Sequence, residues 1–156
     1  MPKVYIAADH AGFTLKEALI PFIESLSFEV EDCGAQEYIE GDDYPDIIAP
    51  CARKVAADQG SMGIVIGASG QGEAMVANRV SGVRAAVYYG NPSTTQQDAA
   101  GKDLSLLQST REHNDANTLS LGARFITEEE AKEAVRTFLM TPPSSDERHV
   151  RRRGQF

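Results

Sequence analysis

The chain has 156 residues, 42% of them apolar, and a formal net charge of −8, which suits one domain with a buried core. An acidic chain is repelled by phosphate backbones, so we expect no nucleic-acid partner. No apolar run approaches the length of a membrane span, and residues 4–8 are too short for a signal peptide, so we also expect no membrane partner. Cys33 and Cys51 form neither a CxxC pair nor a ligand cluster, and we expect a reducing, cytoplasmic location.

Segments with a strand pattern alternate along the chain with segments of helical period. The predicted strands cover residues 3–8, 28–33, 63–66, 83–89 and 118–121. The predicted helices follow apolar stripes at 15–26, 47–55, 73–80 and 131–139. Thr127 and Glu130 form a capping box before the last helix, and Pro21 should kink the first helix or shift its start. The alternation predicts right-handed crossovers and an α/β fold, a three-layer αβα sandwich of about five parallel strands. We expect a single domain over residues 1–156, with a basic tail at 144–156.

A glycine-rich turn, GASGQG, follows the third predicted strand at residues 67–72, and the carboxylate of Glu73 comes next. The residues alone leave two readings open: the glycines only permit a tight reversal, or the amides and the next helix form an anion cradle. The turn has neither the G-x-G-x-x-G spacing of a dinucleotide site nor the Lys-Ser/Thr of a P-loop. Ligands of such sheets bind beyond the carboxyl ends of the strands. Asp9 and His10 lie there, and we expect residues 111–114 there too, although these precede the fifth strand.

Five segments occur in a fixed order: IAADHAGFTLKEAL, DYPD, GASGQGEAMVANRVSGVRAA, REHNDANTLSLGAR and RHVRRR. Together they resemble the ribose-5-phosphate isomerase type B family, which includes galactose-6-phosphate isomerase subunits, and the resemblance covers nearly the whole chain. It implies a Rossmann-like or flavodoxin-like sandwich and a homodimer, or a tetramer, with active sites at the subunit interface. It also implies interconversion of ribose 5-phosphate and ribulose 5-phosphate, a step of the pentose phosphate pathway, without a metal or other cofactor.

One departure from the family pattern concerns the catalytic base. Many members carry a cysteine where this chain has Gly67, while a second branch reads S-G-x-G-E and uses the glutamate. Residues 69–73, SGQGE, resemble that branch, which assigns to Glu73 the proton transfer through an enediolate. The Ser69 hydroxyl and the amides of residues 70–72 could stabilise the enediolate oxygen. We expect Gly67, Gly70 and Gly72 to line the substrate cradle.

The resemblance assigns the remaining sugar contacts. His113 would open the sugar ring, with Asn114 as a neighbouring donor. Asp9 would hold sugar hydroxyls or assist ring opening, and Tyr44 would line the pocket.

The substrate phosphate, a dianion, needs several donors. The family pattern places His10, Arg124, Arg148 and Arg152 on it, and the last two match the spacing of an R-H-x-x-R tail. We interpret the neighbouring arginines of the tail as a solvated charge run.

Several points stay open or receive a structural reading. Asp46 is expected to cap a helix, and His149 either lines the pocket or is exposed. Residues 90–108 are longer than the matching family segment, and we expect a loop with a partial helix. The alternative functions are an isomerase of a hexose 6-phosphate, allose or galactose, and a non-catalytic sugar-phosphate-binding homologue. A binding protein would have no reason to keep Glu73, which favours the isomerase.

Overall fold

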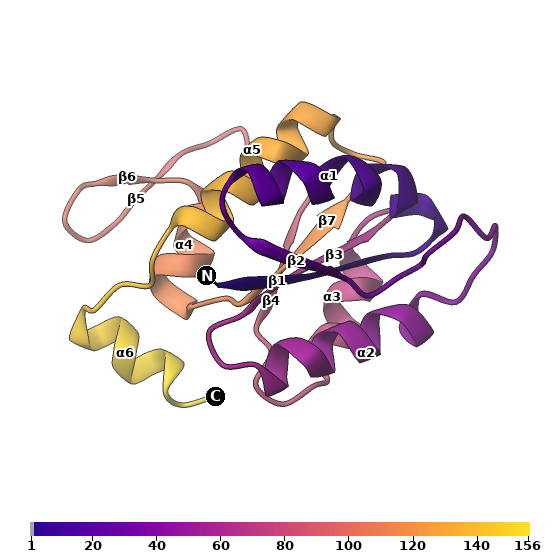
Figure 1. Ribbon diagram of the computed structural model, residues 1–156. Helices are drawn as coiled ribbons and strands as arrows, with labels where there is room; N and C mark the ends of the chain where they lie inside the picture. The colour runs from indigo at the N-terminus through magenta and orange to yellow at the C-terminus, as the bar shows by residue number, and fades with distance from the viewer. Residues whose placement is uncertain (1) are drawn as a thin grey trace.

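The computed structural model describes residues 2–156 and has a five-stranded parallel sheet at its centre (Figure 1). In spatial order the strands are β2 (Glu29–Asp32), β1 (Lys3–Ala8), β3 (Met62–Gly67), β7 (Thr118–Gly122) and β4 (Ala85–Tyr88). The two strands β1 and β3 are buried almost throughout, because they are apolar on both faces. The prediction of about five parallel strands is confirmed.

Helices cover both faces of the sheet. The first face carries α1 (Phe13–Ser25), α4 (Leu106–Asn114) and α5 (Glu128–Met140), and the second carries α2 (Tyr44–Ala57) and α3 (Gln71–Asn78). Strand β1 shows how both cores form: Val4, Ile6 and Ala8 point into the first core, and Tyr5 and Ala7 into the second. The predicted αβα sandwich is therefore confirmed. A short 3₁₀ helix, η1 (His10–Gly12), follows β1, and α6 (Glu147–Arg153) packs on α4.

The helix boundaries exclude one of the two alternatives for Pro21 and correct the prediction for Asp46. Helix α1 begins well before Pro21 and continues through it, so the proline does not shift its start. Asp43 is the N-cap residue of α2 and Asp46 lies in its first turn, so the prediction that Asp46 caps this helix is wrong. The predicted N-cap of α5 is confirmed, because Thr127 Oγ1 accepts a hydrogen bond from the amide of Glu130 at 3.1 Å. Within residues 2–156, no helix combines the length and the apolar character that a membrane span requires.

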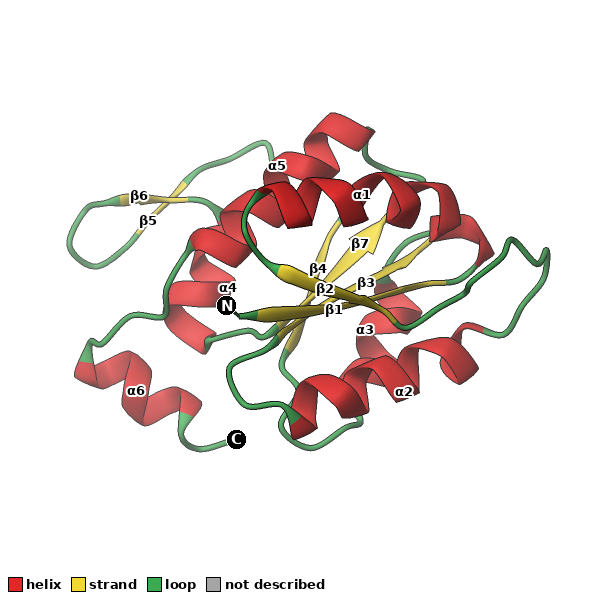
Figure 2. Cartoon of the chain, viewed as in Figure 1, coloured by secondary structure: helices red, strands yellow, loops and turns green. Residues whose placement is uncertain are grey.

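Residues 90–108 contain more structure than the expected loop with a partial helix. They form an antiparallel hairpin of β5 (Gln96–Gln97) and β6 (Asp103–Leu104), followed by the start of α4. Figure 2 shows this hairpin standing away from the central sheet.

The strand order creates a switch point between β1 and β3. From β1 the chain crosses to β2 on one side, and it then returns to β3 on the other side of β1. The loops at the carboxyl ends of these strands therefore leave in opposite directions and open the crevice in which α/β sheets bind ligands. Asp9 follows β1 and the glycine turn follows β3, so the fold brings them to one crevice.

Candidate active site

Asp9 is fixed at the end of β1 by the backbone that follows it. Its Oδ1 accepts hydrogen bonds from the amides of Ala11 at 2.9 Å and Gly12 at 3.3 Å, which makes it the N-cap of η1. Gly12 has to be a glycine, because a Cβ there would lie 2.5 Å from Cγ2 of Ile66 on β3. The close approach of η1 to β3 thus holds the Asp9 carboxylate beside the glycine turn.

Packing explains two glycines of this turn. Gly70 has φ = 77°, in the left-handed region, and its carbonyl accepts a hydrogen bond from Ser120 Oγ at 2.6 Å. Gly72 lies against the ring of Tyr44, where a Cβ would come within 2.7 Å of Cζ. Ser69 Oγ accepts a hydrogen bond from the Gln71 amide at 3.2 Å. These glycines are therefore required for a tight reversal of the chain. The turn also presents the first amides of α3, which have no partner within the helix.

The carboxyl group of Glu73 occupies the space in which a side chain at position 67 would begin. A Cβ built on Gly67 would lie within 2.5 Å of all three atoms of this carboxyl group. Glu73 is only 4% exposed, so the carboxylate has little room to move aside. The glycine at 67 and the glutamate at 73 are therefore one feature: the missing side chain makes room for the acid.

Burial raises the pKa of Glu73 above the ordinary value of a glutamate, although hydrogen bonding to its own amide opposes this. The charge of Asp9, whose carboxyl group lies within hydrogen-bonding reach, raises this pKa further. A carboxylate with a raised pKa is a stronger base and suits proton abstraction near neutral pH.

His10 and Arg124 lie at the same carboxyl edge of the sheet. His10 Nδ1 lies 2.8 Å from Asp42 Oδ1, in the loop before α2. The Arg124 amide donates to the Ala68 carbonyl at 3.1 Å, which places this exposed arginine beside the glycine turn. One cluster, the carboxyl-edge cluster, thus contains the following predicted site residues: Asp9, His10, Tyr44, Gly67, Ser69, Gly70, Gly72, Glu73 and Arg124.

Asp9, His10 and Asp42 also place three possible metal-ligand atoms within 4.8 Å of one another. Two of these residues already bind each other through His10 Nδ1 and Asp42 Oδ1, and Asp9 caps η1. One donor or acceptor atom of each residue is therefore engaged within the protein, and we assign no metal to this group.

The other predicted site residues form a second cluster, the α4–α6 cluster: His113, Asn114, Arg148 and Arg152, with His149. The rings of His113 and His149 lie 4.2 Å apart between centroids. His149 is buried, so the reading in which it is exposed is wrong. Burial lowers the pKa of His149, and the neighbouring charges of His113 and Arg148 lower it further.

The two clusters lie near opposite ends of the sheet. Helix α4 returns to the start of β7, where the Asn117 carbonyl accepts from the Gly63 amide at the start of β3. Gly67, at the other end of β3, is four residues away, about 13 Å at the rise of a strand. The expectation that residues 111–114 lie at the carboxyl edge is wrong for a single chain, because they end a crossover helix that runs back to the amino edge.

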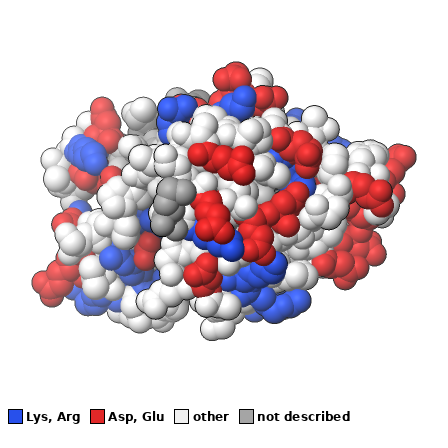
Figure 3. All heavy atoms as spheres, viewed as in Figure 1, with Lys and Arg blue, Asp and Glu red and all other residues white. Residues whose placement is uncertain are grey.

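The two clusters also differ in the charge of the residues around them. Figure 3 shows acidic side chains gathered at the end of the molecule that carries the loop before α2. The acids of this region are Glu37, Glu40, Asp42, Asp43 and Asp46. Helix α6, at the other end, carries four arginines in seven residues. The carboxyl-edge cluster of one chain thus contains a single arginine, Arg124, and lies beside a group of acids, whereas a phosphate dianion needs several donors.

Comparison with known proteins gives the family. A sequence model of the family described as Ribose/Galactose Isomerase matches residues 4–156. The chain belongs to this family. Ribose-5-phosphate isomerase B of Mycobacterium tuberculosis is 41% identical over 150 residues, which are 96% of this chain and 85% of that protein.

Solved structures of Ribose/Galactose Isomerase family members share the fold. Ribose-5-phosphate isomerase B of Mycoplasma genitalium, with bound ribulose-5-phosphate, superposes with a TM-score of 0.83 at 32% identity, covering 98% of this chain and 92% of that one. The Clostridium thermocellum enzyme gives 0.81 at 34% identity, with 98% and 93% covered. The family resemblance predicted from the motifs is confirmed.

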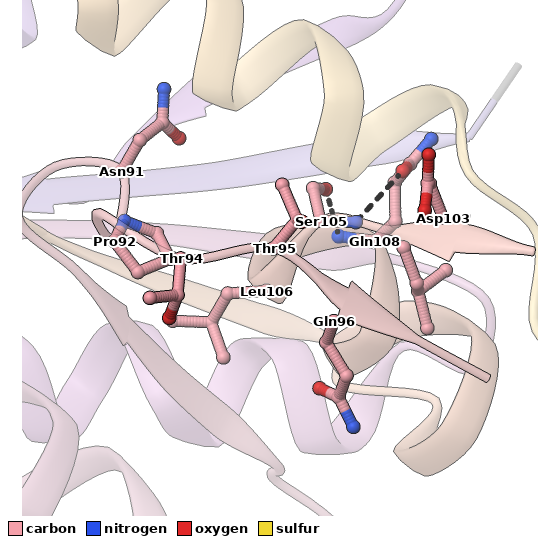
Figure 4. A pocket seen from close by; sticks show the side chains of 10 residues that line it. Asn91, Pro92, Thr94, Thr95, Gln96, Asp103, Ser105, Leu106 and Gln108 are labelled. Carbon is pink, nitrogen blue, oxygen red and sulfur yellow. Dashed lines mark hydrogen bonds between the residues drawn. The ribbon is translucent and has the colours of Figure 1, made fainter.

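In this member of the isomerase family, residues of the hairpin and of the start of α4 line a cavity of about 650 Å³ (Figure 4). Ser105 and Gln108, linked by the capping box of α4, lie on its wall, and none of the predicted site residues does. A second cavity, of about 440 Å³, shares Asn91, Pro92 and Leu106 with the first and reaches Gln71 in the glycine turn. The hairpin therefore borders a hollow that ends next to the carboxyl-edge cluster.

Two residues have roles that the sequence pattern did not show. Arg111, in the family segment REHN, is buried and donates to the Thr141 carbonyl at 3.0 Å and to Asp115 at 2.9 Å, so it joins α4 to the end of α5. Asp42 binds His10, and nothing in the run of acids at 42–43 distinguishes it from its exposed neighbour Asp43.

Proposed function

We propose that this member of the Ribose/Galactose Isomerase family interconverts ribose 5-phosphate and ribulose 5-phosphate. The observation that carries the proposal is the buried Glu73 carboxylate, which fills the side-chain space of position 67 at the carboxyl end of β3. The names of the relatives, and the ribulose-5-phosphate bound in the Mycoplasma genitalium structure, support this choice of substrate.

The reaction moves one proton between neighbouring carbons of the open-chain sugar. Glu73 removes the proton from C2 of the aldose, electrons move toward the carbonyl at C1, and an enediolate forms. The same carboxyl group returns the proton to C1 while the hydroxyl proton of O2 passes to O1, which leaves the carbonyl at C2 and a hydroxyl at C1. We assign the stabilisation of the enediolate oxygen to the Ser69 hydroxyl, whose oxygen accepts from the Gln71 amide, and to the amides at the start of α3. We assign to Asp9 a sugar hydroxyl, since its carboxylate faces Glu73.

We propose that each active site combines the carboxyl-edge cluster of one chain with the α4–α6 cluster of a second copy. The two clusters of one chain lie at opposite ends of β3, and the acidic end needs the arginines that α6 carries. In this assembly His113 opens the sugar ring and Arg148 and Arg152 bind the phosphate, together with His10 and Arg124. Residues 1–156 would act as one isomerase domain of a cytoplasmic homodimer.

The first experiment replaces the base. Glu73→Gln keeps the size of the side chain but cannot accept the proton, so kcat with ribose 5-phosphate should fall about 10²–10⁴-fold. Glu133→Gln, an exposed acid on α5, is the matched control and should keep full activity. A loss of less than tenfold in Glu73→Gln would refute the assignment. Running the assay with allose 6-phosphate as well, with and without EDTA, tests the hexose alternative and the expectation that no metal is needed.

The second experiment tests the shared site. Inactive Glu73→Gln and inactive His113→Ala proteins are mixed under conditions that let subunits exchange. If the two residues meet across the interface, each mixed dimer has one site with both defects and one intact site. Activity should then return toward half of the wild-type value per mixed dimer. Absence of recovery, with exchange confirmed by mass, would show that sites are not shared in this way.

A further inference from the structure

The loop between β2 and α2 closes over His10. Asp42 Oδ1, in this loop, accepts two hydrogen bonds from His10, one from the backbone amide at 3.1 Å and one from ring Nδ1 at 2.8 Å. The ring of Tyr38, from the same loop, meets the His10 ring edge-on, with centroids 6.2 Å apart. Two side chains of one loop therefore define the position of a single imidazole.

The start of this loop is held by a lysine of α1. Lys16, fully buried in α1, donates to Asp32 Oδ2 at 2.5 Å and to the Ala35 carbonyl at 2.8 Å. The following residues return to β1, since the Ala35 amide donates to the Ala8 carbonyl at 2.9 Å. Asp42 therefore belongs to a loop that is attached to the strand end carrying His10.

Among the described residues, the Asp42 carboxylate accepts hydrogen bonds from His10 alone. Its side chain is 11% exposed, and Oδ2 is buried without a hydrogen-bond partner within residues 2–156. A buried carboxylate oxygen without a donor disfavours folding. Both hydrogen bonds that the structure gives this carboxylate come from His10, so the arrangement indicates a role toward His10.

The bond also decides which nitrogen His10 can offer to a ligand. A carboxylate oxygen only accepts hydrogen bonds, so Nδ1 must carry a proton. Nε2, on the far side of the ring, is then the nitrogen that can face a ligand. The Asp42 carboxylate thereby fixes which nitrogen of the ring a phosphate oxygen would meet.

We propose that Asp42 is a positioning residue for the substrate phosphate and acts through His10. It fixes the ring with Nδ1–H directed at its own carboxylate and Nε2 toward the phosphate. This inference rests on the proposed function, in which His10 binds the phosphate.

The test separates phosphate binding from chemistry. In Asp42→Ala we expect KM for ribose 5-phosphate to rise about tenfold, the lower end for a charge-assisted hydrogen bond, with kcat within about threefold. The inhibition constant of inorganic phosphate should rise by the same factor, while kcat/KM for unphosphorylated ribose should not change. Asp42→Asn, whose amide oxygen can still accept from Nδ1, should recover part of the loss. Asp43→Ala, which removes the exposed neighbouring acid with no side-chain cap bond, is the matched control and should behave as wild type.

A double variant shows whether Asp42 acts through His10. Asp42→Ala should have no further effect on the inhibition constant of inorganic phosphate when His10 is already alanine. Independent effects of the two changes, or an Asp42→Ala protein with lowered kcat and unchanged KM, would overturn the inference. These results leave the proposed function intact, whereas a wild-type protein without ribose 5-phosphate isomerase activity would refute the function itself.

Discussion

The shared space of Gly67 and Glu73 predicts an unusual cost for adding one methyl group. In Gly67→Ala the new Cβ would lie within 2.5 Å of three carboxyl atoms, and ordinary contact begins near 3.4 Å, so the carboxyl group must move by about 1 Å or more. Displacement of a reacting group by that distance costs about 100-fold in rate, and complete loss of a base up to about 10⁴-fold. We therefore expect kcat of Gly67→Ala to fall by about 10²–10⁴-fold.

The same overlap predicts a coupled effect on stability. Overpacking a buried site costs about 1–3 kcal/mol, so Gly67→Ala should lower the free energy of unfolding by that amount. In a Glu73→Ala background the carboxyl group is absent, and the added methyl should cost almost nothing. The backbone itself tolerates alanine, since Gly67 is not among the glycines with positive φ.

The assays are conversion of ribose 5-phosphate to ribulose 5-phosphate and chemical unfolding of all four proteins of the cycle. A coupling free energy between the two positions of about 1–3 kcal/mol is expected, within the range of residues in direct contact. Additive stability changes, or Gly67→Ala activity within about threefold of wild type, would refute the reasoning.

Four further results are expected. Arg148→Ala and Arg152→Ala should each lower kcat/KM for ribose 5-phosphate about 10–150-fold and leave kcat/KM for unphosphorylated ribose unchanged. Equal losses of kcat/KM for both sugars would contradict a phosphate contact. Asp9→Asn should move the acid limb of the kcat/KM profile to lower pH, because the Asp9 charge raises the pKa of Glu73, and an unmoved limb would show that the charge does not reach it. Glu73→Gln should raise Tm at neutral pH but not near pH 3. The pKa of Glu73 is raised in the folded state, so the ionised carboxylate lowers stability at pH values above the pKa of an unfolded glutamate. An equal Tm shift at both pH values would contradict this. Alkylation of Cys33 and Cys51 with iodoacetamide should cause no inactivation that substrate prevents, and such protection would place a thiol in the site.

The sequence was enough to predict the strands of the sheet and the residues of the carboxyl-edge cluster. Short apolar runs located β1 and β3, because both strands are buried on both faces, and apolar stripes of helical period located the helices between the strands. The resemblance of the SGQGE turn to one branch of the family pointed to Glu73, since Gly67 has no side chain that could act as the base. The structure adds the reason, which is that both groups would need the same volume.

The remainder depended on where the chain runs in space. The location of His113 depends on α4, a crossover helix that ends at the amino edge before β7, and the apolar pattern does not predict a helix over residues 106–114. The hairpin of β5 and β6 escaped prediction because each strand has only two residues and no alternation to read. Asp42 and Asp43 differ only through the path of their loop, which buries one carboxylate against His10 and leaves the other in solvent.

The placement of the two clusters at opposite ends of the sheet affects how the amount of catalyst scales with the amount of protein. If a site forms only where two chains meet, an isolated chain holds two unfinished halves and turns over nothing. At concentrations well below the dissociation constant of the dimer, the number of working sites then grows with the square of the chain concentration, and above it in direct proportion. Halving the protein in a dilute assay would quarter the rate, and a substrate that bridges both halves would itself favour pairing of the chains.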